Sequence, residues 1–206
     1  DDVTAYENMK LSLLNASHTL LSYPAFLGGY RKVDEAMRDG RIAGFVRQFM
    51  DIDITPYVPA PGDTDLELYK QTLVERFGNR SVSDQIARLC FDGVSKFPVY
   101  VVPNLVKMIR DGKPLTRVAY LIAAYRHYLK YRRDDNGAEF EIAEPAMTEA
   151  DCRLIASDDP SDFLGLSAFG GAADLRGSDA FVSEYLHYVD AIAAHGAMST
   201  LDNMPG

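Results

Sequence analysis

The sequence predicts a mainly α fold with at most a minor β element. Apolar residues recur at helical spacing through most of the 206 residues. Glycines and prolines fall between these periodic stretches, where they end helices or form turns. The sequence lacks an alternation of strands with helices, and it lacks a Gly-x-Gly-x-x-Gly turn between a strand and a helix. The chain is therefore not expected to bind a dinucleotide in the Rossmann manner by itself.

The first half of the chain is expected to hold short helices around one extended loop. Pro24 punctuates the segment that follows the first helix. Three prolines between residues 55 and 62 require a loop there. Asp63 or Asp65 can cap the helix after this loop, and Gly78 can end it. We predict helices over residues 6–21, 30–38, 41–50 and 66–77.

The second half is expected to contain further helices with one short strand between them. A serine can cap a helix through residues 86–94, with Pro98 beyond its end. Thr148 and Asp151 are spaced as an N-cap pair for another short helix. Residues 140–142 alternate between apolar and polar and are the only good strand candidate. We predict the remaining helices over residues 100–110, 114–131 and 178–195.

The composition indicates one globular domain over residues 1–206, since 47% of the residues are hydrophobic and 25% are charged. The net charge of −9 argues against nucleic acid and anionic membranes as partners, because both bind clustered lysine and arginine. No apolar run approaches the ~20 residues of a membrane span, and the start resembles no secretory signal. We therefore expect a soluble, cytoplasmic domain. Cys90 and Cys152 are expected to be reduced, mostly buried thiols.

Three polar residues on the first predicted helix could line one pocket. At about 100° per residue, Lys10, Asn15 and His18 project within an arc of about 140°. A lysine can exchange a proton, an amide can hold a developing alkoxide, and an imidazole can orient a hydroxyl group. The trio suits a polar, hydroxylated substrate. Spacing alone, however, favours the ordinary interpretation of a solvated lysine, a locally bonded asparagine and a core histidine.

Residues 6–18 resemble the signature of the polyol-specific long-chain dehydrogenases. In that signature Lys, Asn and His recur as K-x4-N-x2-H, and a Tyr-Glu pair precedes the lysine, as Tyr6 and Glu7 do here. The family includes mannitol 2-dehydrogenase, arabinitol dehydrogenase and fructuronate reductase. Its members pair an N-terminal Rossmann-type domain with a mainly helical C-terminal domain. The resemblance weakens after Asp151, and it implies that residues 1–206 are the C-terminal, substrate-binding and catalytic domain of a two-domain dehydrogenase.

A second block, residues 69–98, resembles the same family and most of all its mannitol 2-dehydrogenase branch. Asp84, Arg88, Asp92 and Lys96 are spaced by four within it, so on one helix they would form a stripe of ion pairs. The spacing alone favours such a solvated stripe. The resemblance implies instead that Arg88 and Lys96 contact hydroxyl groups of the substrate.

The reaction implied by the resemblance is the interconversion of mannitol and fructose with NAD. We expect a metal-independent route, because the histidines are scattered and the cysteines lack ligand spacing. By similarity, Lys10 would be the base, and Asn15 with an amide from the missing domain would stabilise the alkoxide. His18, Arg88 and Lys96 would position the other hydroxyl groups.

Glu7 lies one helical turn before Lys10 and has two possible roles. It could relay protons between the lysine and water, or it could help to cap the helix.

Several alternatives stay open. Fructuronate reductase, acting on mannonate and fructuronate, and arabinitol dehydrogenase would use the same lysine. A helical interaction module without chemistry would carry Lys10, Asn15 and His18 as a polar patch. NADP is not excluded as the cofactor, because the residues that read the ribose would belong to the missing half. The expected partners are a polyol or ketose substrate and the protein's own Rossmann domain, in a monomer.

Overall fold

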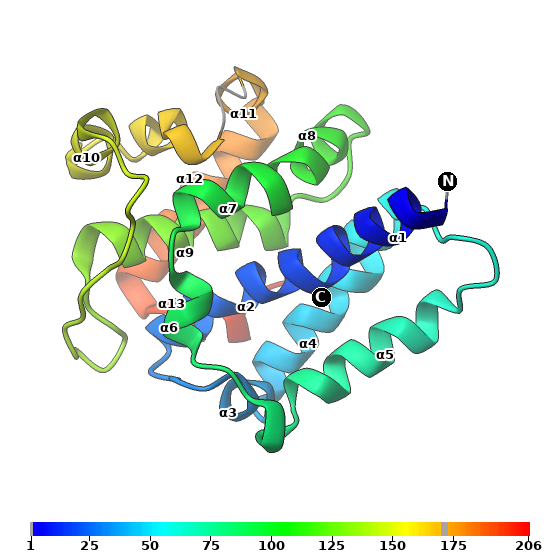
Figure 1. Cartoon of the computed structure of the whole chain (residues 1–206). Helices are drawn as coiled ribbons and strands as arrows, with labels where there is room; N and C mark the ends of the chain where they lie inside the picture. Colours follow the sequence, from blue (N-terminus) through cyan, green and yellow to red (C-terminus); the bar gives the residue numbers. More distant parts are fainter. Residues whose placement is uncertain (1, 170–172) are drawn as a thin grey trace.

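The computed structural model, which describes residues 2–169 and 173–206, is built around one long helix (Figure 1). This helix runs through α1 (Asp2–Lys10), the π-helical segment η1 (Leu11–Asn15) and α2 (Ala16–Leu27). Every residue of α2 except His18 is buried. α4, α6, α7, α9 and α13 all contact α2, so the rest of the domain packs around it.

The other elements are also helices, of which α9 and α12 are the longest. The first group comprises α3 (Val33–Met37), α4 (Gly40–Gln48), η2 (Phe49–Ile54), η3 (Thr55–Tyr57), α5 (Leu66–Phe77), η4 (Arg80–Val82), α6 (Ile86–Cys90) and α7 (Gly93–Tyr100). The second comprises α8 (Val102–Arg110), α9 (Thr116–Tyr131), α10 (Glu149–Ala156), η5 (Pro160–Gly165), η6 (Ser167–Phe169), α11 (Ala173–Gly177), α12 (Asp179–His195) and α13 (Ala197–Asp202).

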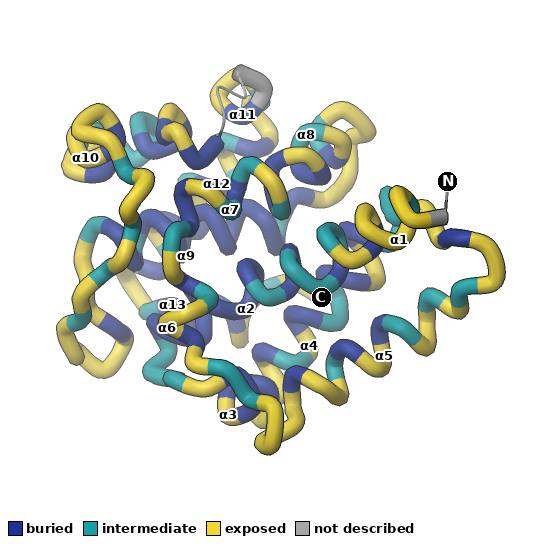
Figure 2. Tube along the Cα trace, in the orientation of Figure 1, coloured by how far each residue is buried: buried dark blue, intermediate teal, exposed yellow. Residues whose placement is uncertain are grey.

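The core lies where α2 meets α9, with α12 against the other side of α9. Figure 2 shows buried residues along α2 and α9, whereas α1 and α5 keep much of their surface exposed. Aromatic rings from α2, α7 and α9 meet there: Tyr23 lies 4.7 Å from Tyr125, and Phe97 stacks on Tyr125 at 4.5 Å. The prediction of a mainly α fold with at most a minor β element is therefore confirmed, and the β element is limited, within the described residues, to two isolated bridges.

Sequence capping signals placed several helices correctly. The Asp65 carboxylate accepts a hydrogen bond from the Leu68 amide and begins α5. Thr148 and Asp151 form the expected capping box of α10. Ser178 caps α12. In each case a polar side chain satisfies an amide that the helix itself leaves unpaired.

The first helix is longer than predicted, because Pro24 does not end it. α2 continues through Pro24 to Leu27, and the Gly28 amide then bonds to the Pro24 carbonyl at 2.9 Å. A proline removes one hydrogen bond from a helix interior. Burial of the whole segment in the core offsets this loss, a tertiary effect that the local sequence does not reveal.

The predicted helix through residues 86–94 is wrong, because it is broken into α6 and α7. Asp92 adopts a left-handed backbone conformation (φ 55°) between them, and Pro98 lies inside α7 rather than beyond a helix end. Arg88 and Lys96 therefore stand on different helices. The expected stripe of ion pairs on one helix face does not exist.

The predicted strand at residues 140–142 is also wrong. These residues form an irregular segment that packs Phe140 and Ile142 against the core. A strand needs a neighbouring strand to pair its backbone groups, and here the neighbours are helices. Cys152 is a further correction: it is exposed, whereas Cys90 is buried as expected.

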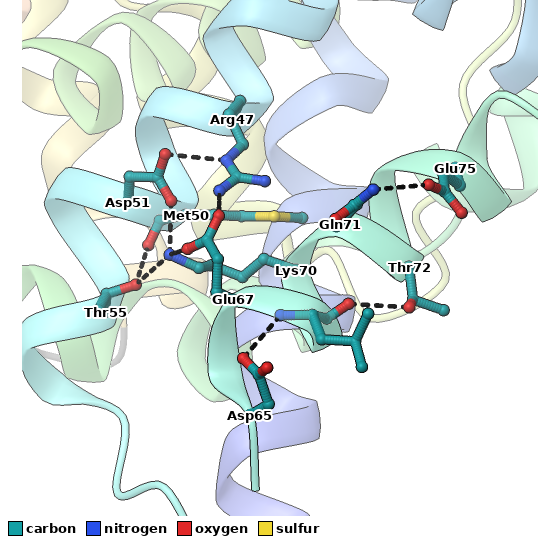
Figure 3. Close-up of polar contacts among 11 residues, drawn as sticks. Arg47, Met50, Asp51, Thr55, Asp65, Glu67, Lys70, Gln71, Thr72 and Glu75 are labelled. Atoms are coloured by element: carbon teal, nitrogen blue, oxygen red, sulfur yellow. Dashed lines mark hydrogen bonds and ion pairs between the residues drawn. The ribbon is translucent and has the colours of Figure 1, made fainter.

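Charged side chains fix α5 against the end of α4 (Figure 3). The buried Lys70 ammonium lies 2.6 Å from the Asp51 carboxylate and 3.0 Å from Glu67. Arg47 pairs with the same two carboxylates. The two positive and two negative side chains alternate in this partly buried network, so each charge lies beside an opposite charge. This network fixes the position of α5, which forms one wall of the candidate site.

Candidate active site

The helix that carries Lys10, Asn15 and His18 is not a regular α-helix. Residues 11–15 are π-helical, with hydrogen bonds between residues five apart. In an α-helix Lys10 and Asn15 would lie about 140° apart. The wider π turn brings a five-residue spacing close to one full turn, so the two side chains lie nearer to one line. The expected arc of 140° is therefore too wide. Such π segments often occur at functional sites.

Lys10 lines an apolar pocket together with Glu7. The cavity has a volume of about 470 Å³, and its other walls are Val3, Tyr6 and Tyr69. Val3 and Tyr6 are large apolar side chains exposed on α1. Burial raises the pKa of Tyr69, and the neighbouring Tyr6 adds to the shift. Lys10 itself is exposed at the edge of this pocket.

His18 stacks on an aromatic ring. Its imidazole lies 4.4 Å from the Phe77 ring at an angle of 28°. Burial lowers the pKa of His18 to about 4; the charges of Arg76 and Lys96 also lower it, while Asp84 opposes them. The ring is consequently neutral near pH 7. A neutral imidazole can donate one hydrogen bond and accept another, which suits contact with a hydroxyl group.

Lys96 is half-buried beside His18. Its ammonium group donates hydrogen bonds to the carbonyl oxygens of Arg88 (3.3 Å) and Leu89 (3.1 Å), in the last turn of α6. Burial lowers the pKa of Lys96, and the acidic groups around it oppose the shift. The Arg88 side chain is 77% exposed and pairs with Asp84 at 3.2 Å. Lys96 and the pair of Arg88 with Asp84 thus stand near the His18 end of the long helix.

The structure distributes Glu7, Lys10, Asn15 and His18 along one long helix, whereas Arg88 and Lys96 belong to α6 and α7. Glu7 and Lys10 share the apolar pocket, whereas His18 and Lys96 are near each other at the next turns. Asn15 lies between them at the end of η1, and its side chain makes no cap hydrogen bond to α2. The lining of the Lys10 pocket includes none of Asn15, His18, Arg88 and Lys96, so the single pocket expected for Lys10, Asn15 and His18 is not found in the described part of the chain.

A larger cavity of about 630 Å³ lies elsewhere on the same helix. Its lining includes Asn8, Ser12 and Asn104. Asn8 lies about 160° around the helix from Lys10. The larger volume is therefore not on the flank that carries the expected catalytic side chains.

Sequence reasoning missed the residues that surround His18. Phe77 and Asp84 lie inside the block of residues 69–98 that resembles the family, as Tyr69 does, and this was the available signal. Their contacts with the first helix join segments more than fifty residues apart, so no local spacing could reveal them.

Three other features are not found among the described residues. They contain no group of three or more His, Cys, Asp and Glu side chains arranged to hold a metal ion. No helix among them is long and apolar enough to cross a membrane. The parallel sheet and glycine-rich turn of a dinucleotide site are likewise missing from this part of the chain. What these residues supply is proton-exchanging and hydrogen-bonding groups on the flank of one helix.

A helical domain with this polar flank is of the kind that accompanies a nucleotide-binding domain in polyol dehydrogenases. The family profile described as "Mannitol dehydrogenase C-terminal domain" matches residues 2–193, and the chain belongs to this family.

The sequence is also similar to individual polyol dehydrogenases. Mannitol 2-dehydrogenase of Aspergillus fumigatus is 35% identical over 200 residues, which are 97% of this chain and 39% of that protein. Polyol:NADP oxidoreductase of Gluconobacter oxydans is 37% identical over 179 residues, which are 87% of this chain and 37% of that protein. The chain thus spans about two fifths of the length of these relatives.

Solved structures match the fold closely. The Pseudomonas fluorescens mannitol 2-dehydrogenase, in a ternary complex with NAD and D-mannitol, superposes with a TM-score of 0.91 and 39% identity. That match covers 98% of this chain and 41% of the other. A D-sorbitol dehydrogenase in substrate-free form gives a TM-score of 0.90 with 33% identity, covering 97% and 41%.

Proposed function

We propose that this chain is the substrate-binding and catalytic domain of an NAD-dependent, metal-independent dehydrogenase that interconverts mannitol and fructose. The observation that carries the proposal is the likeness over 98% of the chain to an enzyme solved with NAD and D-mannitol. The polar flank of the long helix supplies the groups that such a reaction needs. The substrate and the activity belong to the whole protein, of which this chain is one domain.

Lys10 is the base in this proposal. Oxidation of a carbinol removes a hydride from carbon and a proton from oxygen, and the lysine takes the proton. A lysine accepts a proton only when it is neutral, and removal from water favours the neutral amine. Val3, Tyr6 and Tyr69 already surround it with apolar surface. A second domain that covers this surface would complete the desolvation.

Glu7 carries the proton onward. It lines the same pocket as Lys10, one turn earlier on α1. A carboxylate at this place can pass the proton from the lysine to water, which is one of the two roles that the sequence left open for Glu7.

The remaining polar groups hold the substrate. Asn15, whose side chain makes no cap hydrogen bond to α2, can donate to the developing alkoxide. His18 contacts a hydroxyl group as a neutral imidazole. Lys96 and Arg88 contact further hydroxyl groups of the polyol: the charge of Lys96 acts on His18, and Arg88 pairs with Asp84, whose charge also acts on His18.

NAD is assigned to the rest of the protein. The described residues lack the fold of a dinucleotide site, and about three fifths of each relative lies outside the matched segment. When bound, the nicotinamide accepts the hydride, while the residues of this chain handle the proton and the hydroxyl groups.

The second candidate function is that of a dehydrogenase that accepts a broader range of polyols and uses NADP. One relative is named a polyol:NADP oxidoreductase, and one structural match is a D-sorbitol dehydrogenase. A fructuronate reductase and a module without chemistry gain no support from these relatives. The expectations of a monomeric enzyme in the cytoplasm stay predictions.

The test is polyol oxidation by the full-length protein, with and without Lys10→Met. We expect NADH formation with mannitol, and a kcat that falls about 10²- to 10⁴-fold in the variant while KM changes little. Lys113→Met, which alters an exposed lysine outside the site, is the control and should behave as wild type. Sorbitol, arabinitol and mannonate, each with NAD and NADP, define the specificity. Equal rates for wild type and Lys10→Met would refute the role of Lys10.

A further inference from the structure

We propose that Glu144 is a positioning residue for the polyol site, because it caps the helix that carries Lys96. The inference rests on the proposed function, in which Lys96 contacts a substrate hydroxyl group. Glu144 lies in the irregular segment before α10, and its carboxylate reaches the beginning of α7.

The cap of α7 comes from this distant carboxylate. Glu144 Oε1 accepts a hydrogen bond from the Gly93 amide at 3.1 Å, and Oε2 accepts one from the Val94 amide at 3.0 Å. Asp92 occupies the N-cap position but provides no side-chain cap bond within the described part of the chain. The first amides of a helix need such partners, and a negative charge is favourable at this end. Glu144 therefore does what a local cap residue would normally do.

The carboxylate is fixed from two further sides. The Tyr125 hydroxyl donates to Oε1 at 2.9 Å. The carbonyl of the preceding residue, Ala143, accepts from the Asp92 amide at 2.9 Å. A Cβ atom at Gly93 would lie 2.3 Å from the Tyr23 hydroxyl and 3.0 Å from Oε1, so only glycine fits there. These contacts leave one arrangement for the turn between α6 and α7.

This turn determines where the Lys96 ammonium lies. Lys96 follows the capped amides by less than one helical turn. Its ammonium donates back to the carbonyls of Arg88 and Leu89, on the helix before the turn. The left-handed residue, the glycine and the Glu144 cap together hold the two helices at the angle that permits these bonds. Glu144 is also one of the acidic groups that oppose the burial-induced fall in the pKa of Lys96.

The test is a double-mutant cycle in the full-length protein. Glu144→Gln keeps the size of the side chain and removes its charge. We expect the KM for D-mannitol to rise about tenfold, with kcat and the KM for NAD close to wild type. Glu141→Gln is the matched control, since Glu141 is an exposed residue of the same segment. In a Lys96→Met background, Glu144→Gln should add nothing to the KM for mannitol, because the two residues act as a unit.

The possible results distinguish failure of the inference about Glu144 from failure of the proposed function. If Lys96→Met raises the KM for mannitol and Glu144→Gln does not, the inference fails while the proposed function stands. Effects that add in the double variant would overturn it in the same way. If the wild type oxidises no polyol, or Lys96→Met leaves KM unchanged, the proposed function fails first and the inference with it. Tyr125→Phe, which removes one bond to Glu144, should give a smaller rise in KM and guards against misfolding of the first variant.

Discussion

Lowering the pH from 7 to 5 should destabilise this domain through His18. Burial lowers the pKa of His18 from 6.5 to about 4 in the folded chain. Below pH 6.5 the unfolded chain therefore takes up a proton that the folded chain resists. The contribution of neutral His18 to the free energy of unfolding is fully present above pH 6.5. It is lost as the pH decreases toward 4, which is the sign expected for a histidine that the fold holds neutral.

The magnitude follows from the two pKa values. With 6.5 in the unfolded chain and about 4 in the folded chain, linkage gives a loss of about 2 kcal/mol between pH 7 and pH 5. The loss approaches about 3 kcal/mol at lower pH. His127, whose pKa burial also lowers, acts with the same sign. A comparison with a His18 variant removes that contribution, because His127 is present in both proteins.

The assay is urea unfolding of wild type and His18→Gln at pH 7, 6 and 5. The free energy of unfolding of the wild type should fall by about 2 kcal/mol more than that of the variant between pH 7 and pH 5. Titration of the imidazole by NMR should place the His18 pKa near 4, and Phe77→Leu should move it back toward 6.5 because one face of the ring loses its cover. An identical pH dependence in wild type and His18→Gln would refute the reasoning.

Three further predictions concern packing, charge and thiols. Gly93→Ala places a Cβ atom against a buried tyrosine hydroxyl and should lower stability by roughly 1–3 kcal/mol in thermal unfolding. Arg117→Met leaves the buried Asp53 carboxylate unpaired and should destabilise by about 3–5 kcal/mol in urea, with partial recovery when Asp53→Asn is added. Burial raises the pKa of Cys90 to about 12, so at pH 8 an aromatic disulfide reagent should modify the exposed Cys152 alone until the chain is unfolded.

Local chemistry predicted much of the helix content. Asp65, Thr148 and Ser178 begin helices where the sequence placed caps, because capping is decided by a few neighbouring residues. Pro24 and the irregular segment after residue 139 were misread because their structure depends on distant partners. Burial in the core keeps the proline inside a helix, and Phe140 and Ile142 of the predicted strand pack against the helical core instead of pairing with another strand.

The site was predictable to a similar degree. Lys10, Asn15 and His18 do lie on one continuous helix, but the pocket beside Lys10 includes neither of the other two, and the π-helical turn between them was not predictable from their spacing. The placement of Arg88 and Lys96 on separate helices was not predictable, since the break depends on a left-handed residue at Asp92. The role of these five residues in catalysis stays a prediction that the variants above can test.

The π-helical segment determines how α1 is rotated relative to α2. A π turn is an α-helical turn that holds one extra residue. If residues 11–15 adopted regular α geometry with all five residues retained, everything before them would rotate by about 100° relative to α2. α2 is anchored in the core, so the exposed α1 would turn and take Lys10 and Glu7 with it. Deletion of the one extra residue would instead remove the π turn and leave α1 in its present direction. The π geometry thus keeps the proton acceptor on the side of the helix where the groups that hold the substrate lie.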